Sequence, residues 1–152
     1  MALYLVQHGK SLPKDKDPEQ ELSEEGILEV KRIANQAKEY GIAISSIQHS
    51  GKNRAQQTAK MMASALNPPN GIQPINGINP LDDVFIFANK INSKHNIMVI
   101  GHLPFMERLT SHLITGSIDK LVLKFQNAGI ICLDTDDNGS WFIKWTLMPR
   151  IG

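Results

Sequence analysis

Short apolar runs alternate with longer amphipathic segments along most of the 152-residue chain. The apolar runs predict strands over residues 2–7, 42–48, 97–101, 128–134 and 141–147, and residues 72–79 read as a loop with room for a short strand. The amphipathic segments predict helices over residues 24–40, 52–66, 80–92 and 104–115. Strands that alternate with helices favour a mostly parallel sheet covered on both faces, so we expect one three-layer α/β/α sandwich domain over residues 1–152.

Residues typical of helix starts and tight turns support these boundaries. Ser23 is a suitable N-cap, and Glu24 and Glu25 follow it where the helix dipole favours acidic side chains. The Asn138–Gly139 pair between the last two predicted strands is typical of a β-hairpin. That hairpin would give the parallel sheet an antiparallel edge.

Composition and charge are those of an ordinary globular chain, with 41% hydrophobic residues, 20% charged residues and a net charge of +1. A charge so close to zero gives no reason to expect a nucleic acid or an acidic membrane surface as a partner. No run approaches the roughly 18 apolar residues that cross a bilayer, and no signal peptide is visible, so we expect a cytoplasmic protein. Cys132 is the single cysteine, which excludes a disulfide within the chain. The sequence leaves the oligomeric state open.

Two of the predicted strands end in the same way, with a histidine beside a glycine. Residues 3–6 lead into His8 and Gly9, and residues 97–100 lead into Gly101 and His102. Open α/β sheets place their ligand sites outside the carboxyl ends of the strands. We therefore expect His8 and His102 to form two walls of one site.

A third strand end carries a cation at the start of a helix. The segment after the strand over residues 42–48 places Arg54 in the first turn of the next predicted helix. Free N–H groups and the helix dipole favour an anion there, and a guanidinium adds bidentate phosphate contacts. His8, Arg54 and His102 together predict a phosphate site.

These strand ends resemble the histidine phosphatase superfamily, whose signature is Arg-His-Gly at the first strand end. The resemblance extends over nearly the whole chain and includes Leu22-Ser23-x-x-Gly26, Ser50-x-x-x-Arg54-Ala55-x-Gln57-Thr58-Ala59 and Gly101-His102. The continuation Leu103–Pro104 and the compact length are similar to the SixA-type phosphohistidine phosphatases. The resemblance implies a phosphoglycerate mutase-like fold.

The resemblance also implies roles for the residues around the site. His8 would attack phosphorus and become a transient phosphohistidine, which requires a neutral ring with one free nitrogen and the other donating to a backbone carbonyl. Arg54 and His102 would bind the phosphoryl oxygens and stabilise their charge, so no metal and no other cofactor is expected. The expected substrate-binding set also contains Gln7, Gly9, Lys10 and Ser11.

Gln7 departs from the superfamily pattern because it stands where an arginine is usual. An amide donates hydrogen bonds but carries no charge, and the deficit is on the order of 1–2 kcal/mol. We expect phosphate binding to be about tenfold weaker, or somewhat more, without a necessary loss of catalysis. Lys10 and Lys52 are near enough in sequence to compensate.

Acidic side chains are absent from residues 60–79, where larger members of the superfamily carry a glutamate that protonates an alkoxide leaving group. The next acids are Asp82 and Asp83, and Asp83 is a possible proton donor or else an acid in the first turn of a helix. A phosphorylated imidazole needs less help, since a free histidine ring takes up a proton at a pKa of about 6.5. The shortage of acids therefore favours cleavage of an N–P bond.

The short stretch between Arg54 and His102 leaves no room for a lid, and an open site suits a phosphohistidine displayed on a protein. We interpret the chain as a phosphohistidine phosphatase that acts on a signalling or phosphotransfer protein. Two alternatives stay open. One is a phosphomonoesterase of small molecules, and the other is a phosphate-binding module whose catalysis is weakened by Gln7.

Overall fold

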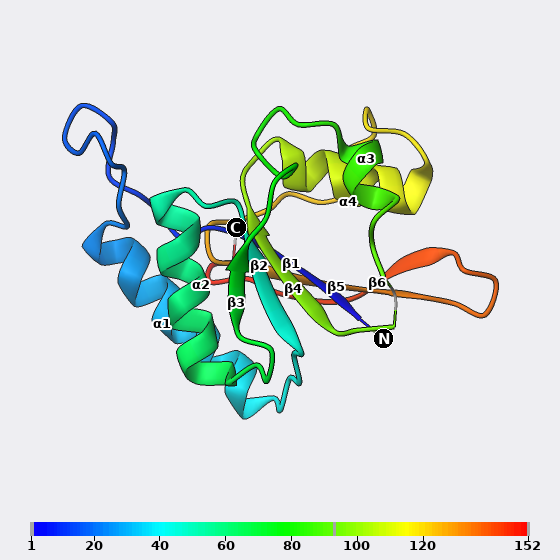
Figure 1. Ribbon diagram of the computed structural model, residues 1–152, viewed down its shortest axis with the longest axis horizontal. Helices are drawn as coiled ribbons and strands as arrows, with labels where there is room; N and C mark the ends of the chain where they lie inside the picture. The colour runs from blue at the N-terminus through cyan, green and yellow to red at the C-terminus, as the bar shows by residue number, and fades with distance from the viewer. Residues whose placement is uncertain (1, 93, 152) are drawn as a thin grey trace.

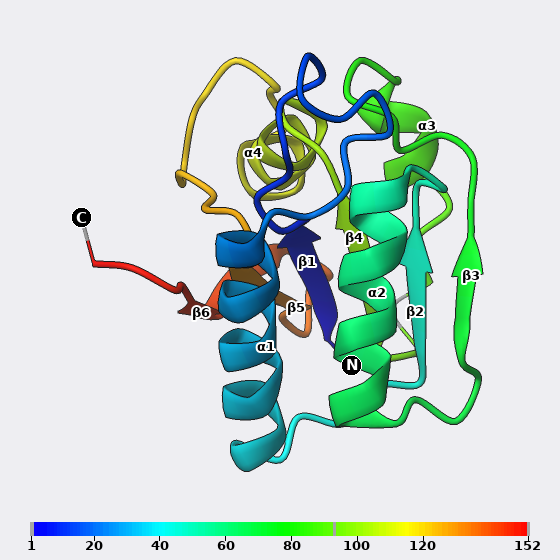
Figure 2. The same ribbon diagram turned by 90° about the vertical axis from the view of Figure 1, so that its left-hand side faces the viewer.

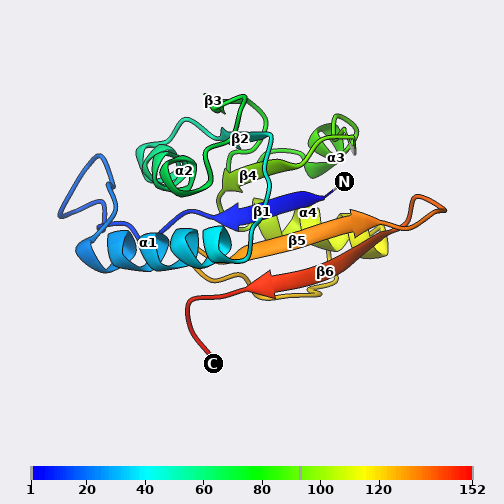
Figure 3. The same cartoon turned by 90° about the horizontal axis from the view of Figure 1, so that it is seen from below.

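A six-stranded sheet forms the centre of the protein (Figure 1), and the computed structural model describes residues 2–92 and 94–151. The strands are β1 (Leu3–Gln7), β2 (Ser46–His49), β3 (Ile72–Pro74), β4 (Ile97–Gly101), β5 (Ile130–Thr135) and β6 (Trp141–Leu147). They lie in the order β3-β2-β4-β1-β5-β6. The first four strands along the chain are parallel, whereas β5 is antiparallel to β1 and β6 is antiparallel to β5. The prediction of a mostly parallel sheet with an antiparallel edge is confirmed (Figure 3).

Helices cover both faces of this sheet, which confirms the three-layer sandwich. They are α1 (Glu24–Glu39), α2 (Asn53–Leu66), α3 (Val84–Ala88) and α4 (Phe105–Thr115). Figure 2 shows α1 and α2 side by side on one face. Because side chains along a strand alternate between faces, Tyr4 and Val6 of β1 enter the core beneath α1 and α2. Leu3 and Leu5 enter the second core, beneath α3 and α4.

The predicted helix start and the predicted hairpin are both confirmed. The Ser23 hydroxyl caps α1 by accepting a hydrogen bond of 3.0 Å from the Gly26 N–H. Gly139 lies in the turn between β5 and β6 with φ +82°, a conformation that glycine adopts without strain.

Two element boundaries predicted from the sequence are wrong. The helix predicted over residues 80–92 is only α3, because Asp83 caps its first turn and Asp82 instead closes a turn by accepting from the Asn79 N–H. The strand predicted over residues 42–48 is only β2, since its ladder begins where Ser46 meets Ile97 of β4. No helix within residues 2–92 and 94–151 is long and apolar enough to cross a membrane.

Candidate active site

His8 and His102 meet at the carboxyl ends of two neighbouring strands. β1 and β4 pair in a register that sets Gln7 beside Gly101, so the next residue of each strand is a histidine. The His8 N–H donates to the Gly101 carbonyl at 3.0 Å, and the two rings lie with centroids 4.9 Å apart at 51°. The structure thus brings the two histidines together as the sequence predicted.

The ring of His8 is held with one nitrogen available. Its Nδ1 lies 2.7 Å from the Gly9 carbonyl oxygen, which only accepts, so Nδ1 carries the proton and donates. Burial lowers the pKa of His8 from 6.5 to about 4, while the bond to Gly9 raises it and the charge of Arg54 lowers it. The ring is neutral at pH 7, and Nε2 has a free lone pair, as the expected nucleophile requires.

The backbone around His8 is fixed by contacts from distant segments. The Gly9 N–H donates to the Thr58 hydroxyl at 2.9 Å, and this hydroxyl donates to the Arg54 carbonyl in the first turn of α2 at 2.8 Å. The Asn127 amide donates to the His8 carbonyl at 3.0 Å. Thr58 belongs to the motif that begins at Ser50, but the sequence alone predicted no role for it. No local residue pattern pointed to Asn127. Thr58 therefore ties the backbone after His8 to α2, and Asn127 ties the His8 carbonyl to the segment before β5.

Packing against α1 requires a glycine at position 9. A Cβ atom at Gly9 would lie 2.6 Å from Val30 Cγ2 of α1. A Cβ at Gly26 would lie 2.0 Å from the Lys10 carbonyl oxygen, so the first turn of α1 packs directly against the loop. The two glycines let α1 support the segment that carries His8.

Arg54 lies in the first turn of α2 and is partly buried. Its positive charge lowers the pKa of both His8 and His102. Burial lowers the pKa of Arg54 itself. No carboxylate pairs with Arg54 among residues 2–92 and 94–151, so its charge is available to an anion.

His102 is almost fully buried, with 2% of its surface exposed. Its Nε2 lies 2.6 Å from the hydroxyl of Ser50, at the end of β2. Burial lowers its pKa to about 3, and the charges of His8, Arg54 and Lys52 act in the same direction. The ring of His102 is therefore neutral as well, so the side-chain cation whose charge acts on both histidines is Arg54.

One known protein is similar to this chain in sequence, and two solved structures are similar to it in fold. The chain is 24% identical over 155 residues to the phosphohistidine phosphatase SixA of Escherichia coli (strain K12), covering 98% of this chain and 94% of that protein. Its fold matches the structure of the protein histidine phosphatase SixA complexed with tungstate, with a TM-score of 0.85, 24% identity and coverage of 98% and 97%. The α-ribazole phosphatase from Shigella flexneri matches with a TM-score of 0.80, 14% identity and coverage of 100% and 98%. No family model matches the chain.

The chain is thus similar in sequence and in fold to a phosphohistidine phosphatase. Its departure from the superfamily signature, Gln7, lies at the end of β1, and the Oε1 atom is buried without a hydrogen-bond partner among the described residues. A donor-only arginine would have no such orphaned acceptor, so the substitution changes both the charge and the hydrogen-bonding pattern of this position.

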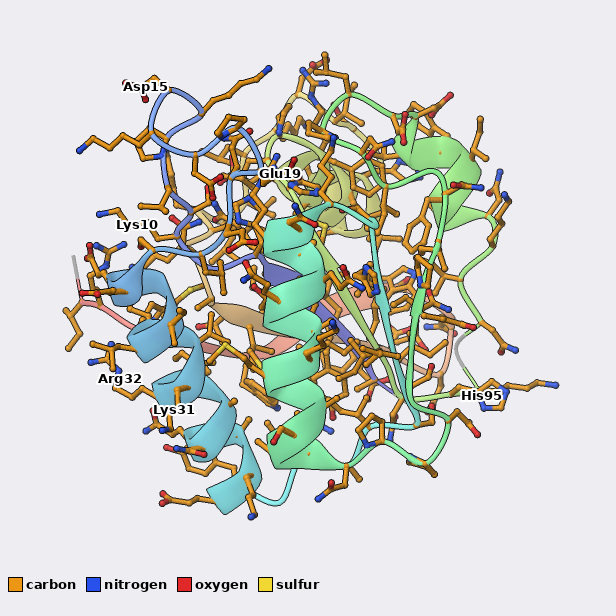
Figure 4. All side chains as sticks on the ribbon, turned by 60° about the vertical axis from the view of Figure 1, so that its left-hand side comes forward. Lys10, Asp15, Glu19, Lys31, Arg32 and His95 are labelled. Atoms are coloured by element: carbon orange, nitrogen blue, oxygen red, sulfur yellow. The ribbon has the colours of Figure 1, made fainter. Side chains whose placement is uncertain are left out.

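Two other residues of the expected substrate-binding set, Lys10 and Ser11, have contacts outside the histidine pair. The Lys10 ammonium lies 2.7 Å from Glu25 Oε2 and points to α1 (Figure 4). Ser11 forms a β-bridge with Leu22. Of the two lysines considered as compensation for Gln7, Lys52 is the one whose charge reaches His102.

Asp83 caps α3, since its Oδ1 accepts from the Phe85 N–H at 2.8 Å. This contact agrees with an acid at a helix start, and a role in proton donation stays a prediction. No group of three or more histidine, cysteine, aspartate or glutamate side chains in the described part of the chain is arranged to hold a metal.

A separate cavity of about 710 Å³ includes Ala2, Leu3, His95 and Ile97 in its lining. These residues belong to the starts of β1 and β4 or to the segment just before them, whereas the histidine pair lies at the strand ends. Neither His8, Arg54 nor His102 lines this cavity, so it is distinct from the candidate site.

Proposed function

We propose that this chain is a phosphohistidine phosphatase in which His8 accepts the phosphoryl group from a histidine of another protein. The observation that carries the proposal is the state of His8. Its ring is neutral, its Nδ1 is tied to the Gly9 carbonyl, and its Nε2 is free beside His102 and the unpaired charge of Arg54. This is the arrangement that a nitrogen nucleophile for phosphorus requires.

In the first step, the lone pair of His8 Nε2 forms a bond to phosphorus. The N–P bond of the substrate breaks, its electron pair stays on the departing imidazole, and that imidazole takes up a proton. Arg54 stabilises the negative charge on the phosphoryl oxygens while the two bonds exchange. In the second step, the oxygen of a water molecule bonds to phosphorus, the bond to His8 breaks, and the water gives up a proton, which releases phosphate.

The contacts of Asp82, Asp83 and Glu25 support a phosphohistidine rather than a phosphate ester as the substrate. Asp82 and Asp83 accept hydrogen bonds from backbone N–H groups, and Glu25 pairs with Lys10. Protonation of an alkoxide needs a positioned acid, whereas an imidazole is protonated near neutral pH. The relative named SixA is called a phosphohistidine phosphatase, in agreement with this choice.

The test compares release of phosphate by the wild type, by His8→Ala and by His95→Ala. The substrates are a protein phosphorylated on histidine with phosphoramidate, and 4-nitrophenyl phosphate. His95 is an exposed histidine at the other end of the molecule from Lys10 (Figure 4), so His95→Ala is the matched control. We expect release from the phosphohistidine protein by the wild type and by His95→Ala, and none by His8→Ala.

Other outcomes identify the alternatives. Faster hydrolysis of the ester than of the phosphohistidine would indicate a phosphomonoesterase of small molecules. Binding of the phosphorylated protein without any release of phosphate would indicate a binding module.

A further inference from the structure

The peptide bond that follows His8 is held at both ends by side chains from distant segments. Its oxygen, the His8 carbonyl, accepts from the side-chain amide of Asn127 at 3.0 Å. Its N–H, on Gly9, donates to the hydroxyl of Thr58 at 2.9 Å in a buried contact. Because glycine adopts more backbone conformations than other residues, a His8–Gly9 peptide without these partners would be free to rotate.

At the oxygen end of this peptide, the bond depends on Asn127. The other donor near the His8 carbonyl is the Ala128 N–H, which lies 3.4 Å from the His8 oxygen but 2.9 Å from the Gln7 carbonyl oxygen. The Ala128 N–H therefore bonds mainly to Gln7. In the described part of the chain, the Asn127 amide is thus the donor at normal hydrogen-bond distance that the His8 carbonyl has.

The turn that presents Asn127 contains a strained residue. Ala128 has φ +69°, a conformation that residues with a Cβ atom rarely adopt, and its side chain is fully buried. The Gly129 N–H closes the turn by donating to the Gln126 carbonyl at 2.9 Å. Backbone strain persists where the surrounding structure fixes it, and it is frequent next to functional sites. The strain at Ala128 therefore agrees with a role for the neighbouring Asn127 in the site.

The orientation of the His8–Gly9 peptide affects the bond that fixes the His8 ring. A rotation of this peptide changes ψ of His8 and φ of Gly9, and the Gly9 carbonyl oxygen moves with the second angle. That oxygen accepts from His8 Nδ1 at 2.7 Å, which keeps the proton on Nδ1 and leaves Nε2 free. A displaced carbonyl would let the proton move to Nε2, and Nε2 would then have no lone pair for attack.

We propose that Asn127 is a positioning residue, whose amide fixes the His8–Gly9 peptide and so keeps the Gly9 carbonyl on His8 Nδ1. This assignment rests on the proposed function for its effect on the reaction. Asn127 acts through the main chain of His8 and leaves Arg54 in place. Its loss therefore slows the attack on phosphorus and changes substrate binding little, so kcat falls while KM stays similar.

The first experiment measures kcat and KM for release of phosphate from the phosphohistidine protein. The variants are Asn127→Ala and Asn127→Asp, which keeps the shape of the side chain without the N–H donor and so tests the assignment even if Asn127→Ala fails to fold. Gln126→Ala is the matched control, because its amide lies in the same turn but bonds the main chain of Arg150.

Loss of one hydrogen bond predicts a kcat about 3- to 10-fold lower in both Asn127 variants, with KM within about twofold of the wild type. We expect wild-type values for Gln126→Ala. An unchanged kcat in the Asn127 variants would overturn the assignment. An equal loss of kcat in Gln126→Ala would overturn it too, since the turn as a whole would then matter and not the bond to His8.

The second experiment uses no substrate. Nitrogen-15 NMR reports the tautomer of His8, whose signals are assigned by their absence from His8→Ala. We expect the Nδ1–H form in the wild type and in Gln126→Ala, and a mixture of the Nδ1–H and Nε2–H forms in both Asn127 variants. The Nδ1–H form alone in every protein would overturn the assignment. A wild type that releases no phosphate would contradict the proposed function, whereas the change of tautomer would still be measurable, so the two proposals fail separately.

Discussion

The helices α1 and α2 both begin at the edge of the sheet where His8 lies, and their first turns are built differently. The start of α1 is closed, because Ser23 caps it, Glu24 and Glu25 compensate its dipole, and Glu25 is paired with Lys10. The start of α2 is open, with Lys52 in the cap position, no side-chain cap and no acid in its first turn. Capping and charge therefore stabilise α1 where it supports the His8 loop, while α2 is left free to receive an anion beside Arg54.

The largest change in oxyanion binding is predicted for a substitution of Arg54. Arg54→Ala removes the unpaired charge from the first turn of α2, and charge-assisted bonds of this kind predict phosphate or tungstate binding about 10- to 100-fold weaker. Arg32→Ala is the matched control in α1, where Arg32 is exposed and donates to the Pro149 carbonyl. We expect calorimetry to show near wild-type binding for the control. Equal losses in both variants would mean that the open start of α2 has no special role.

Lys52→Asp makes the start of α2 resemble that of α1. An aspartate in the cap position stabilises a helix, so the free energy of unfolding should rise by about 0.5–1 kcal/mol. The same carboxylate repels an oxyanion and replaces a charge that reaches His102, and we expect binding about tenfold weaker. Denaturant unfolding and calorimetry on the same sample measure the two opposite changes. A gain of stability with unchanged binding would contradict an anion site at α2.

Gln7→Arg restores the charge that the superfamily signature places at the end of β1. The added guanidinium should tighten oxyanion binding about tenfold, since an amide forms only neutral hydrogen bonds. It also removes the buried, unpartnered Gln7 Oε1. The measurements are phosphate affinity and release of phosphate from the phosphohistidine protein. Turnover that begins only in Gln7→Arg would show that the native chain is a binding module.

The smallest effect on binding is predicted for Ser23→Ala, at the closed start of α1. Loss of an N-cap predicts a free energy of unfolding lower by about 1 kcal/mol. Oxyanion affinity should stay close to that of the wild type, because the hydroxyl bonds the Gly26 N–H and the Lys10 carbonyl but neither His8 nor Arg54. Denaturant unfolding measures the free energy of unfolding, and calorimetry measures the oxyanion affinity. A marked loss of affinity would mean that α1, and not only α2, contributes to the anion site.

The same comparison shows which parts of the structure were predictable from the sequence. The cap at Ser23 and the strand-end positions of His8 and His102 follow from local residue patterns and the β-α order, so these predictions are confirmed. Arg54 is in the predicted first turn for the same reason. These features depend on neighbours in sequence, or on the general rule that parallel strands end at one edge.

Other features depend on packing between distant segments, which one sequence does not reveal. The Asn127 amide bonds the His8 carbonyl across 119 positions, and the Ser50 hydroxyl bonds His102 across 52. The contact of Lys10 with Glu25 depends on how α1 docks against the loop, which Gly26 permits. The predicted helix over residues 80–92 is wrong because the local turn at Asp82 and the cap at Asp83 delay its start.

Trapping the intermediate tests most directly which nitrogen receives the phosphoryl group. The protein is mixed with a ³²P-labelled phosphohistidine protein, quenched rapidly in base, where a phosphorylated imidazole survives, and the labelled peptide is mapped. We predict label on the peptide that contains His8, and none in His8→Ala. Label on another residue, or turnover by the wild type without any labelled chain, would contradict the account.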